Sequence, residues 1–90
     1  MIRREVEVMN RLGLHARAAA RFVHLANRFQ SRVQLSRDGR SMEGKSILGI
    51  LLLAASQGTK LEISADGPDE ADCVAALAAL IEGGFGEEAH

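Results

Sequence analysis

Apolar residues recur along this 90-residue chain with two different spacings, which predict strands and helices in turn. Ile2, Val6 and Val8 fall on one face of an extended segment whose other face is largely charged, and this pattern predicts a strand. Residues 10–14 interrupt the pattern with a glycine. From Ala16 to about Phe29 the spacing is helical, with an apolar stripe at Ala19, Phe22, Val23, Ala26 and Phe29.

The middle of the chain predicts a β-hairpin. Val33 and Leu35 alternate with polar residues, and Asp38-Gly39 follows as a strong turn signal because both positions tolerate positive φ. The return strand is expected at residues 41–43. A further strand is predicted where the alternation returns, at Leu61, Ile63 and Ala65.

Two more helices are predicted in the second half of the chain. Ser46 is a favoured N-cap and opens an apolar stretch, Ile47–Ala55, that we interpret as a short helix. Pro68 and the acidic residues after it suit the first turn of a last helix, which Gly83-Gly84 would end. The apolar stripe of this helix is formed by Val74, Leu77, Ala78 and Ile81.

The predicted order of elements is therefore β-α-β-β-α-β-α. The hairpin requires antiparallel pairing, and helices packed on one face of the sheet give an α+β sandwich. Ninety residues make one small domain, 1–90, in which we expect residues from about 84 to 90 to form a flexible tail.

Composition narrows the possible functions. The net charge of −1 and the absence of Trp and Tyr argue against nucleic-acid binding by a basic surface or by base stacking. Cys73 is the single cysteine, so we expect no disulfide, metal site or cofactor. The longest apolar run has nine residues, whereas a membrane span needs roughly 20. Because the first residues do not resemble a signal peptide, we expect a cytoplasmic protein without a membrane partner.

His15 lies where the first helix is predicted to begin. The first N–H groups of a helix lack intrahelical partners and carry partial positive charge, so they can hold an anion. The same charge disfavours a protonated ring and leaves a nitrogen lone pair for nucleophilic attack. Arg17 adds a planar cation suited to phosphate oxygens. The pattern is compatible with a phosphoryl acceptor, although a histidine at a helix start is also common on ordinary polar surface.

Residues 13–17, Gly-Leu-His-Ala-Arg, resemble the active-site motif of the HPr family, the histidine-containing phosphocarriers of the bacterial phosphoenolpyruvate-dependent phosphotransferase system. Residues 45–50, Lys-Ser-Ile-Leu-Gly-Ile, are similar to the regulatory serine region of that family, and the two blocks have the family's separation. The resemblance extends over nearly the whole chain. It implies an open-faced sandwich in which a four-stranded antiparallel sheet carries three helices on one face.

The same resemblance implies that His15 accepts a phosphoryl group at Nδ1 from enzyme I and passes it to an EIIA-type domain. Arg17 and the backbone N–H of Ala16 would stabilise the phosphate. The protein would be a carrier in sugar transport and not an enzyme. Ala18 departs from the family, in which many members have proline here; alanine restores an N–H and leaves the shape of the phosphate site open.

Ser46 has two compatible interpretations. It is a structural N-cap, and the resemblance implies that it is also a regulatory site for HPr kinase/phosphorylase, since a phosphate is tolerated at a helix N-terminus. The short helix that follows cannot bury every apolar side chain, so part of it is expected to dock partners. The predicted docking residues are Ala20, His24, Lys45, Ile47, Leu48 and Leu51.

Two alternatives stay open at this point. One is a purely regulatory HPr relative, in which phosphorylation of Ser46 is the main event and sugar transport is absent. The other is a ferredoxin-like ligand-binding or metal-binding module, which would need a CxxC or glycine-rich ligand loop that the sequence does not contain. The expected partners are enzyme I, EIIA-type domains and HPr kinase, and the expected oligomeric state is a monomer.

Overall fold

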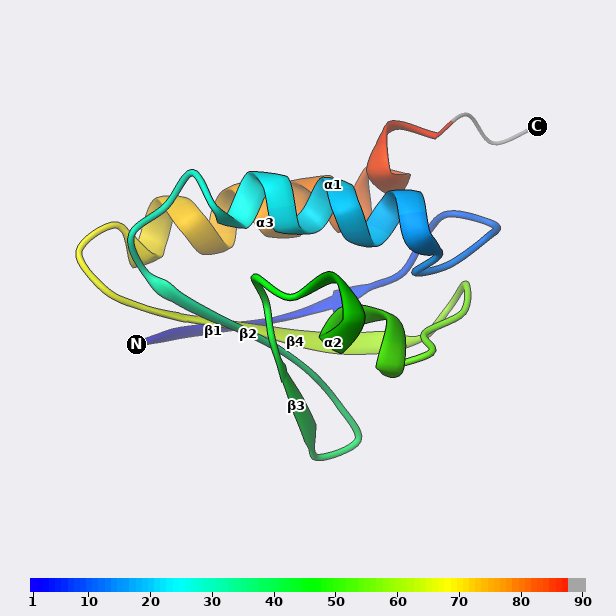
Figure 1. The fold of residues 1–90 in the computed structure, drawn as a ribbon, viewed down its shortest axis with the longest axis horizontal. Helices are drawn as coiled ribbons and strands as arrows, with labels where there is room; N and C mark the ends of the chain where they lie inside the picture. Colours follow the sequence, from blue (N-terminus) through cyan, green and yellow to red (C-terminus); the bar gives the residue numbers. More distant parts are fainter. Residues whose placement is uncertain (88–90) are drawn as a thin grey trace.

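Four antiparallel strands form one sheet. A computed structural model describes residues 1–87 of the chain. The strands are β1 (Ile2–Glu7), β2 (Arg32–Arg37), β3 (Arg40–Glu43) and β4 (Lys60–Asp66). They lie in the sheet in the order β1-β4-β2-β3. The helices are α1 (Ala16–Ala26), α2 (Ile47–Leu52), α3 (Glu70–Glu82) and a final 3₁₀ turn, η1 (Gly84–Gly86). The predicted β-α-β-β-α-β-α order and the α+β open-faced sandwich are confirmed (Figure 1).

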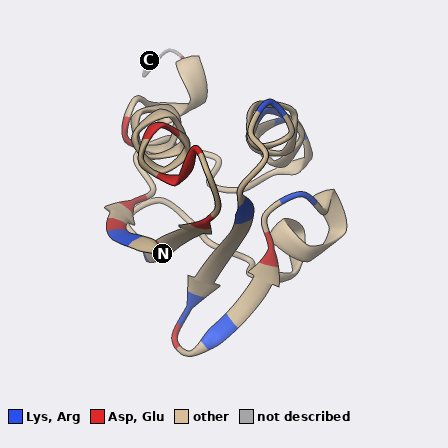
Figure 2. Cartoon of the chain, turned by 90° about the vertical axis from the view of Figure 1, so that its left-hand side faces the viewer, with Lys and Arg blue, Asp and Glu red and all other residues tan. Residues whose placement is uncertain are grey.

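Figure 2 shows the helices on one face of the sheet, and the core of buried hydrophobic residues lies between these two layers. The predicted stripes of α1 and α3 face it, and alternate residues of β2 and β4 are buried beneath them. Each fully buried Leu, Ile or Phe side chain contributes about 1.5–3 kcal/mol relative to an exposed one. The largest of these side chains are Phe22, Phe85, Leu35, Ile50, Leu61, Ile63, Leu77 and Ile81. Within residues 1–87, the opposite face of the sheet carries no helix.

The hairpin turn has the predicted geometry. Asp38 and Gly39 both have positive φ, at 49° and 81°, which matches the twist of the flanking strands. The turn joins β2 to β3 in register, so that Arg37 pairs with Arg40.

Two helices end earlier than their apolar patterns predict. The helix α1 ends at Ala26 and not at Phe29, because two N–H groups beyond it bond only three residues back: Arg28 N–H donates to the Leu25 carbonyl at 3.0 Å, and Phe29 N–H donates to the Ala26 carbonyl at 3.1 Å. The helix α2 ends at Leu52 and not at Ala55, because Ala54 takes a left-handed backbone with φ of 51°. Arg37 closes this end by donating to the carbonyls of Leu53 and Ala54.

The expectation of a flexible tail from about residue 84 is wrong for residues 84–87. Gly84, with φ of 69°, turns the chain back after α3, and Phe85 then enters the core with 1% of its surface exposed. Arg21 of α1 donates a hydrogen bond to the Phe85 carbonyl. Burial of one aromatic ring therefore holds this segment beside the start of α1. Residues 88–90 of the expected tail lie outside the described residues.

Candidate functional site

The loop before α1 is fastened to the domain on two sides. Gly13 has φ of 68°, and a Cβ added to it would lie 2.4 Å from the Ala55 carbonyl oxygen, so only glycine fits. Leu14 N–H donates to that same oxygen at 2.9 Å. On the other side, Asn10 Nδ2 donates to the Gly13 carbonyl at 2.8 Å. These contacts fix where the next residue, His15, enters α1.

His15 is the N-cap of α1, with an extended backbone, and its carbonyl accepts the first helical hydrogen bond from Ala19 N–H at 2.9 Å. The His15 side chain does not itself cap the helix by a hydrogen bond. The N–H groups of Ala16, Arg17 and Ala18 have no intrahelical acceptor and give the helix start a partial positive charge. Ala18 supplies the third N–H, where proline would supply none. The helix start next to His15 is thus suited to hold an anion.

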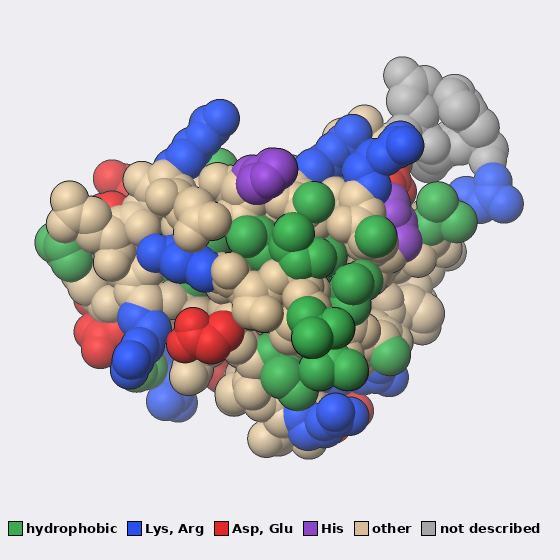
Figure 3. Space-filling view, in the orientation of Figure 1, with side chains coloured by type: hydrophobic (Ala, Val, Ile, Leu, Met, Phe, Trp, Pro, Cys, Tyr) green, Lys and Arg blue, Asp and Glu red, His purple; other side chains and the backbone are tan. Residues whose placement is uncertain are grey.

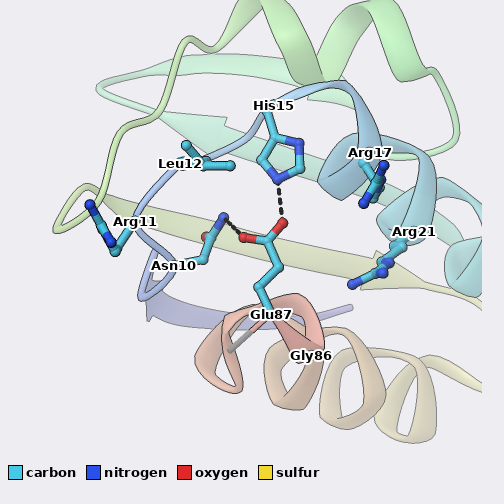
Figure 4. A pocket seen from close by; sticks show the side chains of 8 residues that line it. All are labelled: Asn10, Arg11, Leu12, His15, Arg17, Arg21, Gly86 and Glu87. Atoms are coloured by element: carbon cyan, nitrogen blue, oxygen red, sulfur yellow. Dashed lines mark hydrogen bonds and ion pairs between the residues drawn. The ribbon is translucent and has the colours of Figure 1, made fainter. Parts of the chain in front are cut away.

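The imidazole of His15 is half-buried, and its two nitrogens have different environments (Figure 4). Nε2 contacts the carboxylate of Glu87. Nδ1 makes no hydrogen bond with any residue of 1–87 and faces away from Glu87, on the side of Arg17. The side chain of Arg17 forms no hydrogen bond or ion pair with any residue of 1–87. One ring nitrogen is therefore available as a nucleophile, and an exposed guanidinium lies next to it.

These groups line one open pocket of about 940 Å³. Three arginines and a single carboxylate give it a positive balance, which favours an anionic ligand. Its lining residues are Asn10, Arg11, Leu12, His15, Arg17, Arg21, Gly86 and Glu87. Among residues 1–87, no group of three or more His, Cys, Asp or Glu side chains could hold a metal ion.

Glu87 is held in an ionised state at this site. Burial raises the pKa of its carboxyl, but the hydrogen bonds from Asn10 and His15 and the charge of Arg21 outweigh that effect, so the pKa lies below its usual value. Asn10 Nδ2 donates to Glu87 Oε1 at 3.0 Å, and His15 contacts Oε2. At neutral pH the carboxylate is therefore an acceptor of both hydrogen bonds.

Ser46 lies at the start of α2, apart from the His15 pocket lining. Its Oγ accepts a hydrogen bond from Gly49 N–H at 3.1 Å, which confirms the predicted N-cap. The neighbouring Lys45 is half-buried and bonded to the Phe29 carbonyl, so its ammonium ties two segments together. Phosphorylation of Ser46 remains a prediction.

The predicted docking residues gather on the face formed by α1 and α2. Figure 3 shows hydrophobic side chains collected there, with histidine and basic side chains along one edge. Leu48 is 68% exposed and Ile47 is 39% exposed, whereas Leu51 is half-buried against the core. His24 is exposed on α1 and Ala20 is half-buried.

Several residues of the site have no marker in the sequence. Asn10 and Glu87 belong to this group because their roles depend on contacts across the fold, and no local pattern distinguishes either of them. Leu12 is 73% exposed and lines the His15 pocket, and Leu52 is 52% exposed at the end of α2, which also carries Ile47 and Leu48. A signal existed for Leu12, since a leucine in a glycine-containing loop has few ways to be buried.

Comparisons with known proteins agree with this geometry. Residues 2–83 match the family model of the HPr component of the phosphotransferase system, described by its phosphorylation site. The phosphocarrier protein HPr of Cupriavidus necator is 47% identical over 97% of this chain and 98% of its own length. The phosphocarrier protein HPr of Xylella fastidiosa is 48% identical over 98% of this chain and 99% of its own length. The HPr-like protein Crh of Bacillus subtilis is 45% identical over 91% and 96%.

Solved structures show the same fold. A crystal structure of HPr from Thermoanaerobacter tengcongensis superposes with a TM-score of 0.94 at 44% identity, covering 99% of this chain and 100% of the other. A crystal structure of an HPr dimer from the same organism superposes with a TM-score of 0.77 at 45% identity, covering 91% and 94%. With the family model, the relatives and the fold in agreement, the chain belongs to the HPr family of phosphocarriers of the phosphotransferase system.

Proposed function

We propose that this chain accepts a phosphoryl group from enzyme I on Nδ1 of His15 and passes it to an EIIA-type domain. The observation that supports the proposal most is the state of the two ring nitrogens: Nε2 is engaged by Glu87, while Nδ1 is without a hydrogen bond in residues 1–87. Nδ1 lies beside the start of α1 and on the side of the Arg17 guanidinium. Phosphoryl transfer needs little more than positioning and charge stabilisation.

In the proposed step, the Nδ1 lone pair forms the bond to phosphorus. The bond between phosphorus and the donor breaks, and its electron pair leaves with the donor. The N–H groups of Ala16, Arg17 and Ala18 and the guanidinium of Arg17 stabilise the charge on the phosphoryl oxygens. The reverse sequence hands the group to the acceptor. The chain ends each cycle as it began, as a substrate of enzyme I and a carrier without turnover of its own.

The docking surface for both partners is the exposed apolar surface of α2, formed by Ile47, Leu48 and Leu52, together with Leu12 in the lining of the His15 pocket. A domain of this size leaves isolated apolar side chains exposed, but several together beside a reactive group mark a partner site. Arg17 and His24 lie at its α1 side and supply basic or titratable groups for an acidic partner surface. Enzyme I and EIIA-type domains would use this face in turn and not together.

Ser46 is proposed as a regulatory site for HPr kinase/phosphorylase. A phosphate on Oγ would add about −1.5 to −2 charge directly next to Ile47 and Leu48 of the docking surface. A partner with an acidic rim would be repelled, and one with an arginine cluster would be gained. Because the residue caps α2, phosphorylation would change affinity without unfolding the helix.

A second candidate is a purely regulatory role, favoured by the 45% identity to the HPr-like protein Crh. Under this alternative Ser46 would be phosphorylated, and His15 would not carry phosphate to a permease. A cytoplasmic monomer is proposed in either case. Because one related solved structure is an HPr dimer, light scattering at several protein concentrations tests the monomer directly.

A transfer assay separates the two candidates. Phosphoenolpyruvate labelled on phosphorus, enzyme I, this protein and an EIIA-type domain are mixed, and label on each protein is followed with time. The carrier proposal expects label on the EIIA-type domain only when this protein is present, and none with His15→Ala. Label that stays on enzyme I would overturn it. A phosphate gain with ATP and HPr kinase, lost in Ser46→Ala, would then support the regulatory alternative.

A further inference from the structure

The carboxylate of Glu87 reaches the candidate acceptor from the opposite end of the chain, 72 residues away in sequence. One oxygen, Oε2, contacts His15 Nε2, and the other, Oε1, accepts from Asn10 Nδ2 at 3.0 Å. Figure 4 shows the carboxylate lying between the two side chains. The backbone under Glu87 is fixed as well, because the Phe85 ring is buried and Arg21 donates to the Phe85 carbonyl.

The orientation of Asn10 shows which atoms are donors here. Only 5% of the surface of this residue is exposed, and Nδ2 serves two acceptors, the Gly13 carbonyl and Glu87. The amide keeps this orientation although Oδ1 has no partner among the described residues. Turning the amide over would place Oδ1 against two other acceptors, the Gly13 carbonyl and the Glu87 carboxylate, which would repel it. Asn10 therefore presents a donor to Glu87.

The proton between Glu87 and His15 can then be assigned. The carboxylate is an acceptor because it is ionised at neutral pH. For Nε2 to bond to it, Nε2 must carry the ring proton, and the lone pair of the neutral ring lies on Nδ1. A carboxylate in this place fixes both the tautomer and the orientation of an imidazole, as the aspartate of a catalytic triad does.

Building on the proposed function, we propose that Glu87 is a positioning residue that holds His15 in the Nε2–H tautomer and so presents Nδ1 for phosphoryl transfer. When Nδ1 bonds to phosphorus, the ring keeps its Nε2 proton and gains positive charge. The ionised Glu87 offsets that charge without taking the proton. Asn10 acts on His15 indirectly, because it donates a hydrogen bond to Oε1 of Glu87 and so fixes the carboxylate.

Two substitutions of Glu87 distinguish a positioning role from a merely structural one, because the two roles rank the severity of the substitutions in opposite orders. Glu87→Ala removes the acceptor, and water can replace it in part. Glu87→Gln keeps the shape, but Asn10 Nδ2 attracts the new amide oxygen and turns the amide NH₂ toward His15. That NH₂ favours a lone pair on Nε2 and a proton on Nδ1, which blocks the nucleophile. The near-isosteric change should therefore be the more damaging of the two.

The test combines long-range ¹H–¹⁵N NMR of the His15 ring with the rate of loading from enzyme I and phosphoenolpyruvate. With Glu87→Ala, the Nδ1–H tautomer is expected to gain about tenfold relative to Nε2–H and the loading rate to fall about tenfold, as expected for the loss of one bond to a charged group. Glu87→Gln is expected to change both the tautomer ratio and the loading rate by more than Glu87→Ala does. Glu82→Ala, which removes an exposed carboxylate paired with Arg4, is the matched control and should change neither quantity.

The outcomes are separable. If the parent protein is loaded on His15 but both Glu87 variants keep its tautomer and rate, the positioning role is overturned and the carrier function stands. The positioning role is equally overturned if Glu87→Gln is milder than Glu87→Ala in both readouts. If the parent itself is not loaded, the proposed function fails, whatever the NMR spectra show. Circular dichroism of each variant checks that the fold is retained.

Discussion

Replacing Gly13 by alanine is expected to destabilise the domain more than the same replacement at Gly39, although both glycines have positive φ. The two positions differ in what surrounds the added Cβ. At Gly39, with φ of 81°, nothing in residues 1–87 lies within 4 Å of it. At Gly13, with φ of 68°, the Cβ would lie 2.4 Å from the Ala55 carbonyl oxygen and 2.9 Å from the Ser56 Cα. Gly39→Ala therefore measures backbone strain alone.

The magnitudes follow from these contacts. A left-handed backbone costs alanine about 1–2 kcal/mol relative to glycine, and this is the whole effect expected for Gly39→Ala. At Gly13, relieving the overlap adds about 1–3 kcal/mol. Separating the loop from Ala55 also loses the hydrogen bond from Leu14 N–H, worth about 1 kcal/mol. Gly13→Ala is thus expected to cost about 3–6 kcal/mol in total.

Urea unfolding followed by circular dichroism measures both variants under the same conditions. The free energies of unfolding should differ by about 2–4 kcal/mol, which corresponds to a Tm lower by about 10–30 °C for Gly13→Ala. The Gly13 variant should also load phosphate more slowly, because the same loop delivers His15 to the start of α1. Equal destabilisation of the two variants would mean that the contact between Gly13 and Ala55 contributes nothing to stability, contrary to this prediction.

Three further predictions concern the site and its surroundings. Arg17→Ala should leave the midpoint of urea unfolding unchanged, because this side chain has no partner in residues 1–87, yet slow loading by at least about tenfold; normal loading would remove it from the site. Leu48→Asp should leave stability within about 0.5 kcal/mol but raise the Kd for enzyme I in titration calorimetry, and an unchanged Kd would place docking elsewhere. The pKa of Asp69 is lowered from 3.8 by hydrogen bonds from the Ser31 hydroxyl and the Gln30 N–H, so its contribution to stability is present above that pH and is lost as the pH falls further. Asp69→Asn should therefore reduce the difference in urea midpoint between about pH 5.5 and about pH 3, and an unchanged difference would contradict this assignment.

The regular elements were predictable because their information is local. Apolar spacing located the strands and the stripes of α1 and α3, and Asp38-Gly39 located the hairpin. The ends of α1 and α2 were harder to predict. The chain leaves α1 through tighter turns, and at the end of α2 Ala54 takes a left-handed backbone whose carbonyl, with that of Leu53, is bonded by Arg37 of another element. Tertiary contacts of this kind leave no periodic signal in the sequence.

The candidate site was predictable only where its residues are marked by local sequence. His15, Arg17 and the cap at Ser46 are each marked by position at a helix start. Glu87 is not, because its role arises only after Gly84 reverses the chain and Phe85 is buried. A flexible tail is the natural expectation for a glycine-rich end, and one buried aromatic ring is enough to make it wrong for residues 84–87.

Intact mass spectrometry of the parent protein and of His15→Ala, each incubated with enzyme I and phosphoenolpyruvate, shows whether His15 accepts the phosphoryl group. The parent protein is expected to gain the mass of one phosphoryl group and to lose it in mild acid, and the variant is expected to gain nothing. A parent protein without the added mass, or a variant that gains it as fast as the parent, would contradict the assignment of His15 as the phosphoryl acceptor.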